Sequence, residues 1–244
     1  INFSIRINSL INRINEDDDT YAPRMVFRFL KRLVFKEESI LIGGLTGSGK
    51  SELQRFLINQ ISSEKRIIFI QDSAEMMPLS KRNASLWLYP GDDFQRLQGL
   101  FKAGLRSNPD WLMLSEVRGL ESRVMLQALT SGIAMITTIH SRHLIEIKNR
   151  FLHLLDLQSK EELLQRKKDL AAHIRFYVLV EKLQSTSTIK RRIKGIAILY
   201  KYEEVVYEKV LYEIKGHEEC YQDLPQVVAT EIGVKKEWYD EKNW

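Results

Sequence analysis

Residues Gly44 to Ser51 read Gly-Leu-Thr-Gly-Ser-Gly-Lys-Ser and match the phosphate-binding loop pattern G-x-x-x-x-G-K-[ST] at every position. A short apolar run, 39–42, leads into the loop, and a helical pattern over 50–61 follows it. A strand that turns sharply into a helix points several backbone N–H groups and the positive helix end at one place. The stretch therefore predicts a site for the phosphates of a nucleoside triphosphate; a glycine-rich turn that matches by chance is the alternative.

Each residue type in this loop has a physical reason. The glycines allow the chain to curl around an anion without clashes from a Cβ atom. Lys50 is expected to reach the β- and γ-phosphates, and Ser51 is expected to place its hydroxyl on Mg²⁺. The residues expected to bind the nucleotide are Gly44, Leu45, Thr46, Gly47, Ser48, Gly49, Lys50, Ser51 and Glu52.

The composition is that of a globular protein. The chain has 244 residues, of which 44% are hydrophobic and 28% charged, enough for one substantial core and a small appendage. Cys220 is the single cysteine, so no disulfide can form within the chain and a reducing compartment is expected. No apolar run reaches the roughly 18 residues that a membrane span needs. Because the chain begins at Ile1 rather than methionine, we expect a piece of a longer protein.

The charge balance is only mildly basic. The net charge is +5 and the isoelectric point is near 9.1. Basic clusters occur at 166–168 and 190–194, where they could meet nucleic acid, anionic lipid or an acidic partner. Acidic residues are interspersed over the same region, which favours solvated surface. Direct nucleic-acid binding is therefore not predicted.

The order of elements predicts an α/β fold. A helix with Val26, Phe29, Leu30 and Leu33 on one face precedes the loop, and strands and helices then alternate. The expected strands are 39–43, 66–71, 85–89, 111–115 and 133–139, the expected helices between them are 50–61, 94–105 and 119–130, and β-rich runs follow at 174–182, 193–201 and 205–213. This alternation predicts a mainly parallel sheet with helices on both faces and a β-rich C-terminal part. The expected divisions are a remnant of an N-terminal module with a linker (1–22), the main domain (23–215) and a C-terminal extension (216–244).

Two of the predicted strands end in carboxylates. The strand 111–115 is followed by Glu116, and the strand 66–71 is followed by Asp72 and Glu75. Since carboxyl ends of parallel strands form the ligand crevice of an open sheet, these groups are candidates for the magnesium shell or for polarising water. A turn cap for Asp72 and a solvated carboxylate for Glu75 are the alternatives. His140 ends a third strand, where it could sense the γ-phosphate or be structural.

In this order the segments resemble one family, the hexameric motor ATPases of type II and type IV secretion and pilus systems. The motifs are the phosphate loop, the aspartate-box segment 70–75, the run Leu105-Arg106-Ser107-Asn108-Pro109-Asp110, the segment Ser115-Glu116-Val117-Arg118-Gly119, and a histidine-box segment 130–140. The resemblance covers about residues 25–215 and is strongest for the branch of conjugative type IV secretion and tight-adherence pili. Four positions depart from the family pattern, namely Gln71, Asn108, Ser115 and Gly132.

The resemblance implies a RecA-like ATPase domain that assembles as a cytoplasmic ring, a homo-hexamer peripheral to the membrane. It implies ATP as substrate, Mg²⁺ as cofactor, and inner-membrane secretion or pilus platform proteins as partners. By analogy Glu116 is the Walker B residue and Glu75 the candidate general base. Arg106, Arg118 and His140 would line the site or couple it to neighbouring subunits; with Lys50 and the two glutamates they complete the expected catalytic set. The expected metal ligands are Ser51, Asp72 and Glu116.

The leading hypothesis is therefore an ATP-hydrolysing motor for protein or DNA secretion, conjugation or pilus dynamics. A small-molecule kinase also uses a phosphate loop, but it needs an arginine-rich lid and an acceptor pocket that the sequence does not identify. A nucleotide-gated interaction module is the non-enzymatic alternative. A GTPase is disfavoured because no Asn-Lys-x-Asp segment is present.

Overall fold

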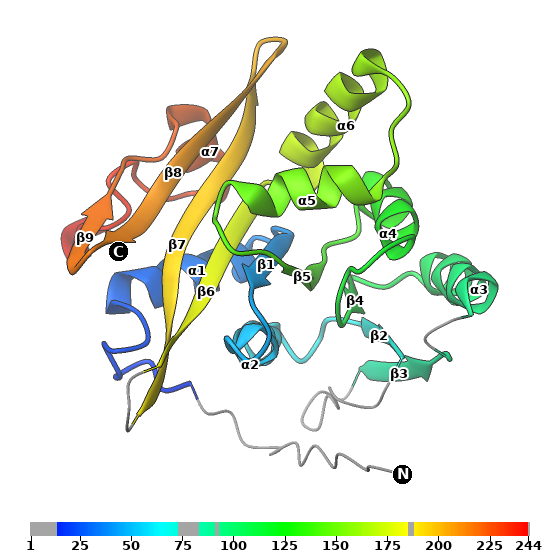
Figure 1. The fold of residues 1–244 in the computed structure, drawn as a ribbon, viewed down its shortest axis with the longest axis horizontal. Helices are drawn as coiled ribbons and strands as arrows, with labels where there is room; N and C mark the ends of the chain where they lie inside the picture. The colour runs from blue at the N-terminus through cyan, green and yellow to red at the C-terminus, as the bar shows by residue number, and fades with distance from the viewer. Residues whose placement is uncertain (1–13, 73–82, 91–92, 185–187, 244) are drawn as a thin grey trace.

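The computed structural model describes residues 14–72, 83–90, 93–184 and 188–243, and the other residues lie outside the description. Strands and helices alternate through the first two thirds of the chain, and a β-rich part follows (Figure 1). The elements are α1 (Arg24–Phe35), β1 (Ile40–Gly44), α2 (Lys50–Asn59), β2 (Ile67–Gln71), β3 (Ala84–Leu88), α3 (Phe94–Arg106), β4 (Trp111–Leu114), α4 (Glu121–Thr130), β5 (Ile136–His140), α5 (Glu146–Leu154), α6 (Lys160–His173), β6 (Phe176–Gln184), β7 (Ile189–Tyr202), β8 (Val205–Lys215), β9 (Glu218–Tyr221), α7 (Gln226–Ile232) and the 3₁₀ turn η1 (Glu241–Asn243). The strands and helices predicted from periodicity are confirmed to within a few residues at their ends.

The strands form a six-stranded sheet, in the order β5-β1-β6-β7-β8-β9, and a three-stranded sheet, in the order β3-β2-β4. Strands β1 to β6 run parallel where they pair, and β7 to β9 follow in antiparallel order. Isolated parallel bridges, Trp111 with Ala134 and Val117 with Ile139, connect β4 to the β5 side. The two sheets therefore continue one another, and the carboxyl ends of β1, β2, β4 and β5 share one edge.

Helices cover both faces of this combined sheet, as the alternating pattern predicts. Alternate residues of β1 enter different cores: Ile40 and Ile42 belong to a core that includes apolar side chains of α1, α2 and α7, whereas Leu41 belongs to one that includes side chains of α3, α4, α5 and α6. All five residues of β1 are buried. A strand that is covered on both faces reads as a continuous apolar run, which explains the sequence before the loop.

The gap between β4 and β5 is closed by side chains rather than by a full backbone ladder. Gln54 of α2 is 1% exposed, and its Nε2 donates to the carbonyls of Leu114, at 3.0 Å, and Ile136, at 2.8 Å. The Thr137 hydroxyl also donates to the Leu114 carbonyl, at 2.9 Å. One helix thus holds together the strands that end in the two candidate site segments.

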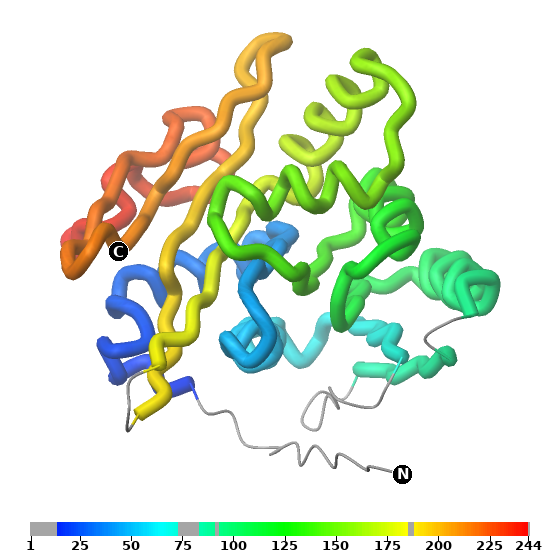
Figure 2. The backbone as a smooth tube through the Cα atoms, viewed as in Figure 1, coloured from blue at the N-terminus to red at the C-terminus, as the bar shows by residue number. Residues whose placement is uncertain are grey.

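Both flanks of the predicted main domain pack into its core. Tyr21 and Ala22, from the predicted linker, are buried. Trp238 from the predicted C-terminal extension is fully buried, with its ring 4.4 Å from that of Phe29 in α1. Figure 2 shows the C-terminal segment, in red, lying against the antiparallel strands. Most of the expected N-terminal remnant, residues 1–13, lies outside the described residues, and the proposed divisions stay predictions.

Replacing Gln54 by leucine should destabilise the fold. The substitution keeps the side-chain volume but leaves the Leu114 and Ile136 carbonyls without the donor that they share in the interior, a loss of about 1–3 kcal/mol. Urea unfolding measures the change. Gln95→Leu, at an exposed position of α3, is the matched control and should change the free energy of unfolding by less than about 0.5 kcal/mol. Equal stability of the two variants would contradict a structural role for the amide.

Candidate nucleotide-binding site

The phosphate loop leaves the carboxyl end of β1 in a conformation that requires glycine. Gly47 and Gly49 have φ angles of 75° and 101°, and Gly49 caps the start of α2. A Cβ on Gly44 would stand 2.5 Å from the Val180 carbonyl oxygen and 2.4 Å from the Ser48 hydroxyl oxygen. Within the described part of the chain, that buried hydroxyl has no hydrogen-bond partner. The loop is therefore a cradle of backbone groups at a helix start, the geometry that binds phosphate.

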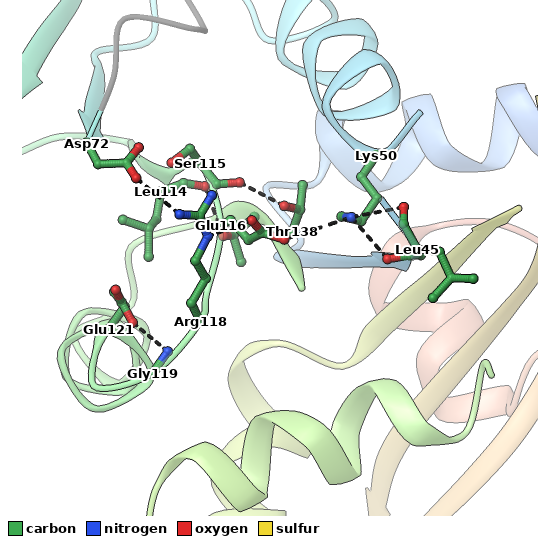
Figure 3. Close-up of polar contacts among 12 residues, drawn as sticks. Leu45, Lys50, Asp72, Leu114, Ser115, Glu116, Arg118, Gly119, Glu121 and Thr138 are labelled. Carbon is green, nitrogen blue, oxygen red and sulfur yellow. Dashed lines mark hydrogen bonds and ion pairs between the residues drawn. The ribbon is translucent and has the colours of Figure 1, made fainter. Parts of the chain in front are cut away.

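Lys50 lies across the loop with its ammonium over backbone carbonyls. Its Nζ donates to the carbonyls of Gly44, at 3.0 Å, and Leu45, at 3.3 Å, and its side chain is only 10% exposed. The same nitrogen is 3.8 Å from Oε1 of Glu116 (Figure 3). The predicted phosphate cation and the predicted Walker B carboxylate therefore meet at one point.

The two described carboxylates are joined by an arginine. Arg118 donates from Nε to Oε2 of Glu116, at 2.8 Å, and from Nη1 to Oδ2 of Asp72, at 3.3 Å. Figure 3 shows the guanidinium lying between the two acids. The hydrogen bond to Glu116 is the main cause that raises the pKa of Arg118. Asp72 follows β2 and Glu116 follows β4, so the expectation that these strand ends converge is confirmed.

The residues present suit a magnesium ion that arrives with its nucleotide. Among the described residues no group of three or more histidine, cysteine, aspartate or glutamate side chains could hold a metal ion. Mg²⁺ in nucleotide sites takes one or two protein ligands, the phosphates and water. Ser51 in the first turn of α2, with Asp72 and Glu116 at the strand ends, would be that small set of oxygen donors.

The other predicted site residues are distributed around this edge and beyond it. His140 ends β5, pairs in register with Gly44 and is exposed. Glu52 is in the first turn of α2 and bonds Arg55 at 3.2 Å. Arg106 is the last residue of α3, and the chain continues from there through Asp110 into the start of β4. The Asp110 carboxylate accepts the N–H of Arg66, which precedes β2. Arg106 therefore lies near the amino ends of these strands, at the edge of the sheet opposite the site. Glu75 falls outside the described residues.

Sequence reasoning missed two polar residues that build the site. Gln54 was recognisable only as a polar residue among the apolar positions of its helix. Thr138 donates its hydroxyl to the Ser115 carbonyl, at 2.9 Å, and its own carbonyl accepts the Val117 N–H, at 2.8 Å. These contacts fix the backbone on both sides of Glu116. No local pattern marks these contacts, since both partners of Thr138 lie in the segment that follows β4.

The family described as Type II/IV secretion system protein matches residues 4–227. The chain belongs to this family. The resemblance inferred from the ordered motifs is therefore confirmed.

Two relatives of this secretion-family chain show how much of them it spans. It is 30% identical to an uncharacterized protein of Bacillus anthracis, over 84% of this chain and 48% of that protein. It is 32% identical to the type IV secretion system protein VirB11 of Bartonella henselae, over 55% of this chain and 41% of that protein. The chain thus spans about half the length of these relatives or less.

A solved structure supports the fold of this family member. The VirB11 ATPase from the Brucella suis type IV secretion system, in complex with sulphate, aligns with a TM-score of 0.61 and 24% identity. The alignment covers 77% of this chain and 56% of the other. The fold is RecA-like, as predicted. Within the described residues, no helix is both long and apolar enough to cross a membrane.

Removing the Lys50 ammonium should abolish nucleotide turnover. Lys50→Ala deletes the cation that lies over the loop carbonyls, and a lost charge-assisted contact of about 1.5–3 kcal/mol weakens binding by about 10-fold or more. Titration with a fluorescent ATP analogue and a phosphate-release assay measure both effects. Lys102→Ala, at an exposed position of α3, should behave as the wild type. Hydrolysis by Lys50→Ala at the wild-type rate would place the active site elsewhere.

Proposed function

We propose that this chain is the catalytic part of an ATP-hydrolysing motor that powers protein or DNA secretion, conjugation or pilus dynamics at the cytoplasmic face of a membrane. The observation that carries the proposal is the approach of Lys50 Nζ to Glu116 Oε1, at 3.8 Å, beside a glycine cradle. A phosphate cation and an acidic strand end at this distance are the minimal set for phosphoryl transfer from a bound nucleotide. Membership of the secretion family supports a mechanical use of that reaction.

In the proposed reaction the chain's own groups bind and orient the triphosphate. The backbone N–H groups of the loop and the start of α2 receive the phosphates, and Lys50 exchanges carbonyl partners for phosphate oxygens. Mg²⁺ held through Ser51, with Asp72 and Glu116 around it, would neutralise charge on the phosphates. Arg118 keeps the Glu116 carboxylate at the strand end, and Glu75 is the proposed base for the attacking water.

A small-molecule kinase is the second candidate, and a cavity supports its consideration. A cavity of about 320 Å³ lies beside Arg118, lined by Tyr89, Phe94, Leu97, Arg118, Gly119, Leu120 and Glu121. Burial raises the pKa of Tyr89 to about 12, so this phenol stays neutral at physiological pH. An acceptor other than water would occupy this cavity.

Phosphate release from ATP in buffer without any metabolite favours the motor, whereas consumption of ATP only with an added acceptor favours the kinase. ATP binding without turnover under either condition would leave the nucleotide-gated module.

The carboxylates should separate binding from turnover. Glu116→Gln and Glu75→Gln preserve shape but remove charge and basicity, so ATP should bind normally while turnover falls by about 10²-fold or more. Binding titrations and phosphate release give the two quantities. Glu64→Gln, an exposed control, should leave both unchanged. If one of the two substitutions leaves turnover intact, that carboxylate has no role in hydrolysis.

We propose that the chain assembles into a ring, a homo-hexamer on a membrane platform. In this ring Arg118 should act in the site of its own subunit and not in that of a neighbour. Arg118 bonds Glu116 and Asp72 of the same chain, so Arg118→Ala should lower turnover. Mixing Arg118→Ala with Lys50→Ala subunits should not restore it, because each site with an intact lysine then lacks its arginine. The same mixture made with Arg106→Ala tests a contribution from a neighbour. Rescue in the Arg118 mixture would show that this arginine acts across the interface instead.

A further inference from the structure

The hairpin of β6 and β7 reaches beyond the start of the phosphate loop. Strand β6 runs parallel to β1, with Val180 opposite Gly44, and β7 returns antiparallel, with Ile193 opposite Val180. Residues of β7 that precede Ile193 therefore lie past the carboxyl end of β1. Figure 2 shows this end of the hairpin, in yellow, beside the linker, in blue, and the Ile193 N–H donates to the Tyr21 carbonyl at 2.8 Å.

Strand alternation sends two adjacent arginines of this hairpin to different partners. Arg192 is opposite Glu181 of β6 and bonds its Oε1 at 2.7 Å. Arg191 lies on the loop instead, and its Nε donates to the Gly47 carbonyl at 3.0 Å. The Arg191 Cδ lies 3.0 Å from the place that a Cβ on Gly49 would take. The loop glycine thus makes room for the arginine stem, and one arginine of the basic cluster 190–194 belongs to the candidate site.

The hydrogen bond from Arg191 to Gly47 fixes the loop backbone and leaves the rest of the guanidinium available to an anion. The C=O and N–H of one trans peptide point in opposite directions. Holding the Gly47 carbonyl therefore orients the Ser48 N–H, which donates to the Leu45 carbonyl at 3.1 Å. Arg191 is exposed, and no residue in the described part of the chain bonds its two Nη groups. Guanidinium N–H groups recognise phosphate oxygens in pairs.

We propose that Arg191 is a nucleotide-binding residue, supplied by the same subunit, that holds the loop through Nε and binds a phosphate group of the nucleotide through Nη. The inference rests on the proposed function, since it deepens the same site. It assigns a role to a residue far from every loop and carboxylate motif of the sequence. In this proposal Lys50 binds phosphate oxygens from the inner side of the loop, and Arg191 binds them from the side that faces the hairpin of β6 and β7.

The test measures binding of a fluorescent ATP analogue to the wild type, Arg191→Gln, Arg191→Ala and Arg192→Ala. Glutamine keeps a donor for the Gly47 carbonyl but has no charge, so it separates loop positioning from phosphate binding. Arg191→Gln and Arg191→Ala should bind ATP about 10-fold more weakly or worse, and inorganic tripolyphosphate should lose a similar factor as a competitor. Arg192→Ala should bind within about 2-fold of the wild type, and thermal unfolding without nucleotide confirms that each variant is folded.

The outcomes distinguish this inference from the proposed function. A wild-type protein that binds and hydrolyses ATP, with both Arg191 variants equal to Arg192→Ala, overturns the inference alone. Weaker ATP binding with unchanged tripolyphosphate competition overturns the phosphate assignment, because the contact then involves the nucleoside. Loss of affinity in Arg191→Ala but not in Arg191→Gln overturns the charge contact and leaves only loop positioning. A wild-type protein that binds no nucleotide overturns both proposals.

Discussion

The side-chain amide of Gln54 is the constraint on which the site geometry depends. It is four residues after Lys50 on α2, so both side chains lie on one face of the helix. Its Nε2 bonds the Leu114 carbonyl, two residues before Glu116. The separation of lysine and carboxylate is therefore set by one helical turn, one buried hydrogen bond and the two residues that follow β4. A residue that only filled space at this position would pack the helix without fixing its register against β4.

The charges of the described residues at the site are close to balanced. Lys50 is paired with Glu116, and Arg118 is shared between Glu116 and Asp72. In the described part of the site, two cations thus face two carboxylates, and these pairs leave little positive charge for an anion. The attraction for a triphosphate must come from the loop N–H groups, the positive end of α2 and the metal that the nucleotide carries. A further guanidinium at the loop, that of Arg191, lies outside these pairs.

The parts of the structure that were predictable from sequence are those set by local patterns. The glycine spacing of the loop, the apolar run of β1 and the acidic strand ends near Asp72 and Glu116 follow from backbone conformation and from the shared edge of parallel strands. The parts that were not predictable depend on tertiary partners. In the sequence Gln54 resembles any polar residue on a helix, and its role depends on two carbonyls that only the folded chain brings to it. Trp238 lies in a polar segment, and nothing local predicts its burial. It is buried because its ring packs on Phe29 of α1, which would otherwise be exposed on that side.

Arg191 shows why a charge cluster cannot be interpreted from composition alone. The run 190–194 looks like solvated surface, yet alternation along β7 gives successive residues separate environments. Arg191 contacts the phosphate loop, Arg192 pairs with Glu181, and Ile193 is buried in the core. Ile193 also ties the same strand to the linker through the Tyr21 carbonyl. Arg191 and Ile193 are two residues apart on one strand. A shift of the loop against Arg191 would therefore be transmitted through this strand to the segment around Tyr21, which leads toward the N-terminus of the chain.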